Sequence, residues 1–433
     1  MIRCFYLFIF FAFLFACDTA SNVPSPNKNY FIKYFGGDGD QIAKDLIVNN
    51  DGTFFILGNS IPPDGTTKKV YLAKANALGE LISQITFGVD TEARDFVLTS
   101  DGKIAVVANK NNISSSNTDV LLIRFTLDLS PLDSVLLFAG TSNISSENAN
   151  SLTELTDGGF IVEGFVGDIN QSFELHLRVD SQLKKYVGTG SWLETNGSGT
   201  KNVGIRAIQN VSVGEYYTFG HTDAAYKGKN ANNIKFWAFN YKDNGIGINN
   251  TDLPFYEQSG IGLDNTLTDA AVVPSGGYLL VGISSTPTED NLKAVITSSN
   301  YPGLEFAYSG VSHDLILKDN NSSSLLGKGP NPFATVYSSV NNHNFILANR
   351  YNTQSGKSDI LLTKIDNNLV SLWGNKDEPN FVSFGGDGDD TAAAVAELPD
   401  GHIIVLGTMQ LGNPPAQFKI ALIKLNSNGK FAD

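Results

Sequence analysis

The chain repeats one short pattern seven times: a turn residue, a short apolar stretch and then a small residue. The small residue lies six positions after the turn residue in every copy, and the turns recur about every 60 residues. A period of this size, built from short strands, is typical of a β-propeller with one blade per repeat. The sequence therefore predicts an all-β, seven-bladed β-propeller. The turn residues are Gly52, Gly102, Gly158, Gly214, Gly276, Asn342 and Gly401, and the small residues are Gly58, Ala108, Gly164, Gly220, Gly282, Ala348 and Gly407.

Each repeat divides into four strands. In the first repeat we expect strands over 43–49, 54–57, 70–75 and 81–87, with the Asp51-Gly52 turn closing a hairpin. The second strands are mostly apolar, so they should be buried between neighbouring sheets. The side chains expected to be buried are Phe54, Ile56, Ile104, Val106, Phe160, Val162, Tyr217, Phe219, Leu279, Phe345, Ile403 and Val405.

The two ends of the propeller sequence predict how the ring closes. The last repeat reaches its third strand at 420–426 and has no fourth, whereas the segment 29–36 supplies a spare strand near the N-terminus. Pairing this segment into the last blade would close the ring and cover two exposed sheet edges, which are sites of aggregation. We therefore expect one propeller domain over residues 30–433.

The first sixteen residues have the pattern of a signal peptide. Arg3 precedes an unbroken apolar run, 5–16, that is too short to cross a bilayer. The run ends in Leu-Phe-Ala followed by Cys17, which resembles the lipobox of bacterial lipoproteins, although Phe15 is bulkier than usual. The resemblance implies cleavage before Cys17 and lipidation of its thiol, with residues 17–29 as lipidated cysteine and flexible tether. An ordinary signal peptide that contains a cysteine is the alternative.

Charge and cysteine content exclude several classes of partner. The chain has 30 Lys and Arg against 44 Asp and Glu, a net charge of −14, and no basic block, which argues against nucleic acid and against anionic headgroups. Cys4 lies in the signal peptide, so the mature chain is predicted to lack disulfides and Cys-ligated metals. We expect a monomer that contacts the membrane of a bacterial envelope through its lipid anchor, at the outer membrane or cell surface rather than the inner membrane.

Several fourth strands end in an aromatic residue followed by Gly. Examples are Phe35-Gly36-Gly37, Phe87-Gly88 and Phe384-Gly385-Gly386. Together with the turn and small-residue pattern, this resembles bacterial extracellular propeller repeats of the form FGG…DGG…G…D-x-x-L-x-K-x-D over nearly all of 30–433. The resemblance implies a propeller in a secreted protein or lipoprotein, and it implies no particular chemistry.

The connecting segments fall into two classes. In a propeller, the turns between first and second strands, and between third and fourth strands, lie on one face, and here they are short. The loops between second and third strands, and the crossovers between blades, lie on the other face and are long, as at 60–68, 110–118 and 221–233. Variable loops on a rigid scaffold are where binding usually resides, although insertions also accumulate where they do no harm.

Acidic residues in two crossovers are the best candidates for a metal site. Asp38 and Asp40 in one crossover, and Asp387, Asp389 and Asp390 in another, alternate with Gly and could wrap a calcium ion. The alternative is a solvated turn in which these carboxylates cap backbone N–H groups. The five histidines lack the spacing of a metal pair, so zinc catalysis is not expected.

No concentrated catalytic motif is present, and no G-x-S-x-G elbow occurs. We therefore expect a non-catalytic binding or scaffold module whose long loops present a surface to a protein or glycan partner. The alternative is a carbohydrate-active enzyme, a glycoside hydrolase or lyase, that uses loop carboxylates near the central channel. The aromatic side chains that could contact a ligand on this face are Trp192, Tyr226 and Tyr351.

Overall fold

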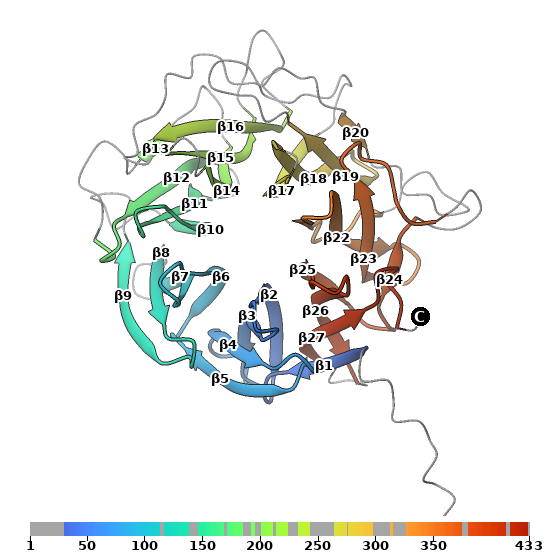
Figure 1. The fold of residues 1–433 in the computed structure, drawn as a ribbon, viewed down its shortest axis with the longest axis horizontal. Coiled ribbons are helices and arrows are strands. Elements are labelled where there is room, and N and C mark those ends of the chain that lie inside the picture. The colour runs from blue at the N-terminus through green and yellow to red at the C-terminus, as the bar shows by residue number, and fades with distance from the viewer. Residues whose placement is uncertain are drawn as a thin grey trace, which may run out of the picture.

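The computed structural model describes residues 30–112, 117–137, 146–168, 171–184, 192–194, 201–210, 214–223, 233–242, 264–274, 276–297, 312–314, 326–374, 380–412 and 416–431. These residues form 27 strands in seven antiparallel sheets, which are arranged around a ring (Figure 1). The predicted seven-bladed, all-β propeller is confirmed. Within these residues, no helix has the length and apolar character that a membrane span requires.

The blades follow one another in chain order, and the strands of each are given from the innermost outward. Blades one to three comprise β2 (Asp40–Val48), β3 (Phe54–Ile61), β4 (Lys69–Ala75), β5 (Leu81–Phe87); β6 (Thr91–Leu98), β7 (Ile104–Asn112), β8 (Asn117–Phe125), β9 (Pro131–Leu137); and β10 (Glu147–Glu154), β11 (Phe160–Gly167), β12 (Ser172–Val179), β13 (Trp192–Glu194). Blades four and five comprise β14 (Asn202–Asn210), β15 (Glu215–Thr222), β16 (Lys235–Lys242); and β17 (Asp264–Val272), β18 (Tyr278–Ser285), β19 (Asp290–Ile296), β20 (Ser312–Asp314). Blades six and seven comprise β21 (Ala334–Ser338), β22 (His343–Asn352), β23 (Lys357–Asp366), β24 (Val382–Phe384); and β25 (Thr391–Glu397), β26 (Ile403–Leu411), β27 (Gln417–Leu425) and β1 (Phe31–Phe35).

The N-terminal strand closes the ring as predicted. β1 pairs antiparallel with β27, with Phe31 opposite Lys424 and Phe35 opposite Ile420, so the outermost strand of blade seven comes from the start of the propeller sequence. The two ends of the described chain therefore lie in one blade (Figure 1).

The repeated small residue has a structural cause. The innermost strands of six blades contain a β-bulge, and the small residue of the second strand pairs with the residue just before it. A Cβ atom on Gly164 would lie 1.9 Å from the carbonyl oxygen of Asn148, and one on Gly282 would lie 2.2 Å from that of Thr266. Because the backbones approach so closely, Gly164 and Gly282 have no room for a side chain, whereas blade two accommodates the methyl group of Ala108 at the same position. The strand does not end at the small residue as expected, since β3 continues through Gly58 to Ile61.

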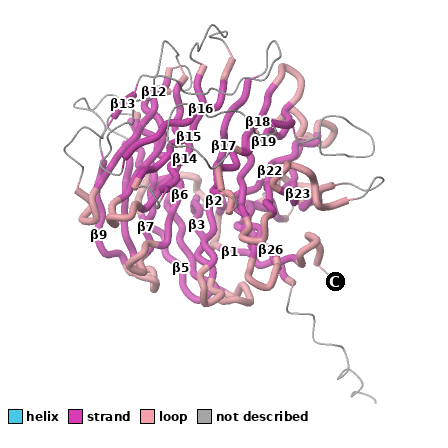
Figure 2. Tube along the Cα trace, turned by 45° about the horizontal axis from the view of Figure 1, so that its top comes forward, coloured by secondary structure: helices cyan, strands magenta, loops and turns pink. Residues whose placement is uncertain are grey.

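The core lies between the blades. All twelve second-strand side chains that were expected to be buried are at most 6% exposed. Strands run between two faces of the ring (Figure 2). One face, here called the short-turn face, carries the tight turns within blades, for example Gly52 N–H to the Asn49 carbonyl and Gly79 N–H to the Asn76 carbonyl. The opposite face, with the crossovers and the loops between second and third strands, is called the long-loop face.

Candidate functional site

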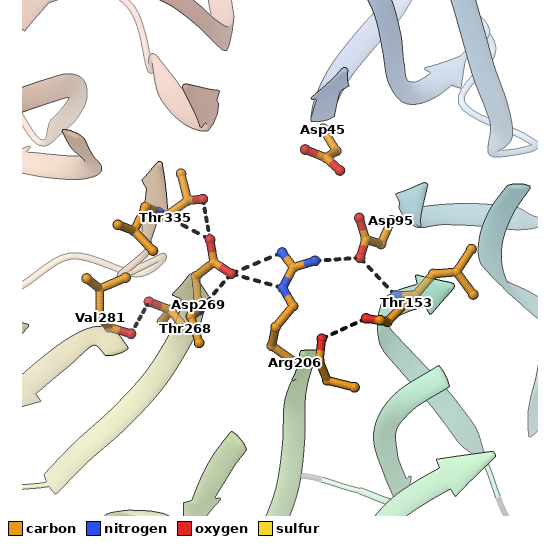
Figure 3. A network of polar contacts seen from close by, with 12 residues as sticks. Asp45, Asp95, Thr153, Arg206, Thr268, Asp269, Val281 and Thr335 are labelled. Atoms are coloured by element: carbon orange, nitrogen blue, oxygen red, sulfur yellow. Dashed lines mark hydrogen bonds and ion pairs between the residues drawn. The ribbon is translucent and has the colours of Figure 1, made fainter. Parts of the chain in front are cut away.

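One residue of each innermost strand occupies the same register position, opposite the residue that precedes the small residue. In the six bulged strands this position comes directly after the bulge. Four of the seven residues are charged, and the side chains of Asp45, Asp95, Arg206 and Asp269 point toward the middle of the ring (Figure 3). The full set is Asp45, Asp95, Ser151, Arg206, Asp269, Thr335 and Ala394.

Arg206 is the centre of this axial network. Its Nη1 donates to Asp95 Oδ2 over 2.8 Å, and its Nε and Nη2 donate to Asp269 Oδ1 over 3.1 and 3.0 Å. The Arg206 side chain is 30% exposed, whereas Asp95 and Asp269 are 5% and 7% exposed. Each guanidinium nitrogen therefore has an acidic partner on another blade.

The two carboxylates extend the network to further blades. Asp95 Oδ2 also accepts the backbone N–H of Leu152 over 2.8 Å. Asp269 Oδ2 accepts the hydroxyl of Thr335 over 2.6 Å and the backbone N–H of Val336 over 3.1 Å. Hydrogen bonds thus connect the innermost strands of blades two to six across the axis (Figure 3).

Asp45 lies beside Asp95 in the axial network (Figure 3). Burial and the negative charge of Asp95 raise the pKa of Asp45 well above its usual value. Although burial opposes it, the charges of Asp269, Asp95 and Asp45 raise the pKa of Arg206, so its positive charge persists. A carboxyl whose pKa is raised by burial and by a neighbouring carboxyl is an arrangement from which acid–base chemistry can be built. The same arrangement also serves to hold blades together.

The sequence analysis did not identify these residues. Asp45, Asp95 and Asp269 each lie thirteen positions before the small residue of their repeat, and this constant offset was the available signal. Arg206 lies fourteen positions before Gly220, because it pairs with a residue thirteen positions on, Phe219, whereas Asp45 pairs with a residue twelve positions on, Leu57.

A second buried polar cluster lies between blades three and four. Glu163 and His176 pair directly across β11 and β12, and both side chains are 0% exposed. The Nδ1–H of His176 donates to Glu163 Oε1, and His176 Nε2 lies 2.9 Å from the Tyr216 hydroxyl. The equivalent pairs in the other six blades are all apolar: Leu57–Leu72, Val107–Leu122, Phe219–Ala238, Val281–Ala294, Leu347–Leu362 and Leu406–Leu422.

The acids of the crossover into blade one have separate positions. Asp38 is exposed, and Asp40 Oδ1 accepts the backbone N–H of Phe418 over 3.0 Å. Lys419 Nζ donates to the carbonyls of Gly37 and Gly39 over 2.6 and 2.9 Å, so a cation of the chain itself binds this segment.

The crossover into blade seven is held in a similar way. Asp387 is exposed, Asp389 Oδ2 lies 2.9 Å from Lys357 Nζ, and buried Asp390 accepts the backbone N–H groups of Gly386 and Gln410. Burial raises the pKa of Asp390. Among the residues described, no group of three or more His, Cys, Asp and Glu could hold a metal ion. Calcium binding by the crossover acids stays a prediction.

The predicted ligand-face aromatics are only partly described. Tyr351, at the end of β22, is partly buried and packs against Gly327 and Gly329. It lines a pocket with Asp290 and Asn331 that has room for about one water molecule. Tyr226 and Cys17 lie outside the described residues, as does the side chain of Trp192, whose backbone belongs to β13.

Comparison with known proteins places the fold among propellers. No protein-family model matches the chain, and no curated protein matches it. Among solved structures, it is similar to a polysaccharide lyase described as a PL25 ulvan lyase, with a TM-score of 0.56 and 10% identity over 92% of this chain and 97% of that one.

Two related structures give the same result. The ulvan lyase bound to -[GlcA(1-4)Rha3S]- has a TM-score of 0.55 and 12% identity, over 92% of this chain and 96% of that one. The polysaccharide lyase Uly1 has a TM-score of 0.51 and 10% identity, over 94% of each chain. At these identities the likeness establishes the fold.

Proposed function

We propose that this chain is an envelope-anchored, non-catalytic module that binds a polysaccharide through its long-loop face. The observation that carries the proposal is the state of the axial network. Asp95, Asp269 and Arg206 use their charges to bind one another across the ring, and the carboxylates also accept backbone N–H groups of blades three and six. Charged groups that already satisfy one another stabilise a scaffold and leave little to act on a substrate.

Two further observations support a polysaccharide partner. Solved propellers that match this fold over more than 90% of the chain are described as polysaccharide lyases. The sequence places its variable loops on the long-loop face, which is the kind of surface on which propellers and other rigid scaffolds bind ligands.

The position of the N-terminal strand supports an outward-facing long-loop face. β1 begins on the short-turn face, where the Tyr30 ring lies 5.5 Å from the ring of His402 in the first turn of blade seven. A tether from Cys17 would join the propeller on this face, so the long-loop face would point away from the membrane. A Cys17→Ser chain should leave the membrane fraction, and retention of that variant in the membrane would show that another element anchors the protein.

A carbohydrate-active enzyme is the second candidate. Asp45 favours it, because its raised pKa beside the Asp95 carboxyl resembles the perturbed pKa of catalytic carboxyl pairs. In this case the reacting carboxyls belong to the innermost strands rather than to the loops.

Binding and turnover assays on the same polysaccharides separate the two candidates. We expect the full chain to bind one or more polysaccharides without producing new reducing ends or the ultraviolet absorbance of a lyase product. Turnover that Asp45→Asn abolishes, while binding is retained, would overturn the non-catalytic proposal in favour of the enzyme.

A further inference from the structure

A group of three cations and one carboxylate lies between blades one and two on the long-loop side of the axis. Lys44 Nζ and Lys68 Nζ each lie 3.0 Å from a different oxygen of Glu92, and Arg94 Nη1 lies 3.6 Å from Glu92 Oε1. Lys44 belongs to β2, Lys68 to the loop that leads into β4, and Glu92 and Arg94 to β6. We call these four residues the basic cluster.

The basic cluster carries an excess of positive charge. Three cations and one carboxylate leave a local net charge of +2, in a chain whose net charge is −14. Although burial opposes it, Arg94, Lys44 and Lys68 lower the pKa of Glu92 to about 2. Burial lowers the pKa of Lys44, which means that its charge is incompletely compensated there. A second anion would relieve this imbalance.

Arg94 also has an unused donor. Its Nε is buried and has no hydrogen-bond partner among the described residues. A buried donor without an acceptor is destabilising, and native proteins rarely leave one unless another molecule supplies the acceptor. Because this atom is covered by the protein, a ligand would meet the remaining part of the Arg94 side chain, which is 30% exposed.

The fold itself does not require these cations. Lys44 and Arg94 are the bulge residues of their strands, and the corresponding residues of the other bulged strands are Asn150, Ile205, Thr268 and Ala393. The side chains of the basic cluster are between 22% and 37% exposed, so solvent reaches them. A ligand on the long-loop face could therefore reach them too.

We propose that Lys44, Lys68 and Arg94 form a subsite for an oxyanion substituent of an acidic polysaccharide. The ligand group would be a carboxylate or a sulfate ester, and it would accept hydrogen bonds from the ammonium and guanidinium groups. Glu92 is a positioning residue that binds one lysine through each of its carboxylate oxygens. This inference rests on the proposed function, since it names the class of polysaccharide that the same face binds.

Four polymers and three variants test the proposal. The full chain is titrated with polygalacturonate and its carboxyl-reduced form, and with dextran sulfate and dextran. The variants are Arg94→Gln, Lys68→Gln and the control Lys357→Gln. Lys357 is a matched control because it is 39% exposed against 37% for Lys68, and it pairs with one carboxylate, that of Asp389. Circular dichroism verifies that each variant is folded.

We expect the wild type to prefer one charged polymer over its neutral counterpart. Arg94→Gln and Lys68→Gln should each weaken that binding about tenfold, whereas Lys357→Gln should change it less than about twofold. Preference for polygalacturonate identifies a carboxylate, and preference for dextran sulfate identifies a sulfate ester.

Three results would overturn the proposal in distinguishable ways. Equal affinity for charged and neutral polymers would refute the oxyanion subsite and leave the proposed function standing. Equal losses in all three variants would show a general effect of charge rather than a site. Binding of neither charged nor neutral polysaccharides would remove the proposed function and this inference together.

Discussion

Replacement of His176 by Leu should destabilise the propeller strongly, and replacement of His176 and Glu163 together should restore most of the loss. The His176 imidazole binds the Glu163 carboxylate, and both side chains are 0% exposed. With His176→Leu alone, the Glu163 carboxylate stays buried without that partner, which costs about 3–5 kcal/mol of unfolding free energy. With Glu163→Leu alone, the imidazole can stay neutral, and we expect a loss of about 1–3 kcal/mol.

The double variant reproduces the Leu–Leu pair that blades one, six and seven already contain. It loses the contact of His176 with the Tyr216 hydroxyl, about 1 kcal/mol, and gains apolar burial of about 2 kcal/mol. The double variant should therefore lie within about 2 kcal/mol of the wild type in unfolding free energy. This loss is much smaller than the sum of the losses in the two single variants.

Urea unfolding of the four proteins at one pH, followed by circular dichroism, measures this cycle. The midpoints give the differences in stability as long as the slopes agree. If the two single losses add in the double variant, Glu163 and His176 do not act as a pair. A loss below about 1 kcal/mol for His176→Leu would show that the carboxylate does not depend on the imidazole.

Three other changes test the axis and the closure of the ring. Arg206→Met should lower stability by about 3 kcal/mol, because it leaves the buried carboxylates of Asp95 and Asp269 without their cationic partner; thermal denaturation measures this. Asp45 has a raised folded pKa, so its stabilising contribution is present below about pH 3.9 and is lost as the pH rises through the folded pKa. Asp45→Asn should therefore be more stable than wild type at neutral pH and less dependent on pH, and a lower melting temperature at pH 7 would contradict this. Deletion of residues 30–36 should expose the edge of β27 and cause aggregation visible by light scattering, whereas a monomeric, folded deletion variant would refute the closure argument.

The number of blades and their closure were predictable from the sequence because their signals are local. Each turn and small residue is set by the backbone of one hairpin: the turn needs its tight geometry, and Gly164 needs room opposite a bulge. Ring closure follows from counting strands, since one repeat lacks a fourth strand and 29–36 supplies it. The difference between the short-turn face and the long-loop face also follows from the lengths of the connecting segments.

The axial network and the buried Glu163–His176 pair were decided only by the tertiary structure. Arg206 lies 111 residues from Asp95 and 63 from Asp269, so a similar place in each repeat does not reveal which of these side chains bind one another. They meet because closure of the ring brings the innermost strands together and the bulges turn one residue of each strand toward the axis. Glu163 reads as an ordinary polar residue at the end of a strand until the register shows it opposite His176, between two blades. Which polar groups become partners depends on pairing and packing over the whole ring, whereas the repeat that builds the ring depends on neighbouring residues alone.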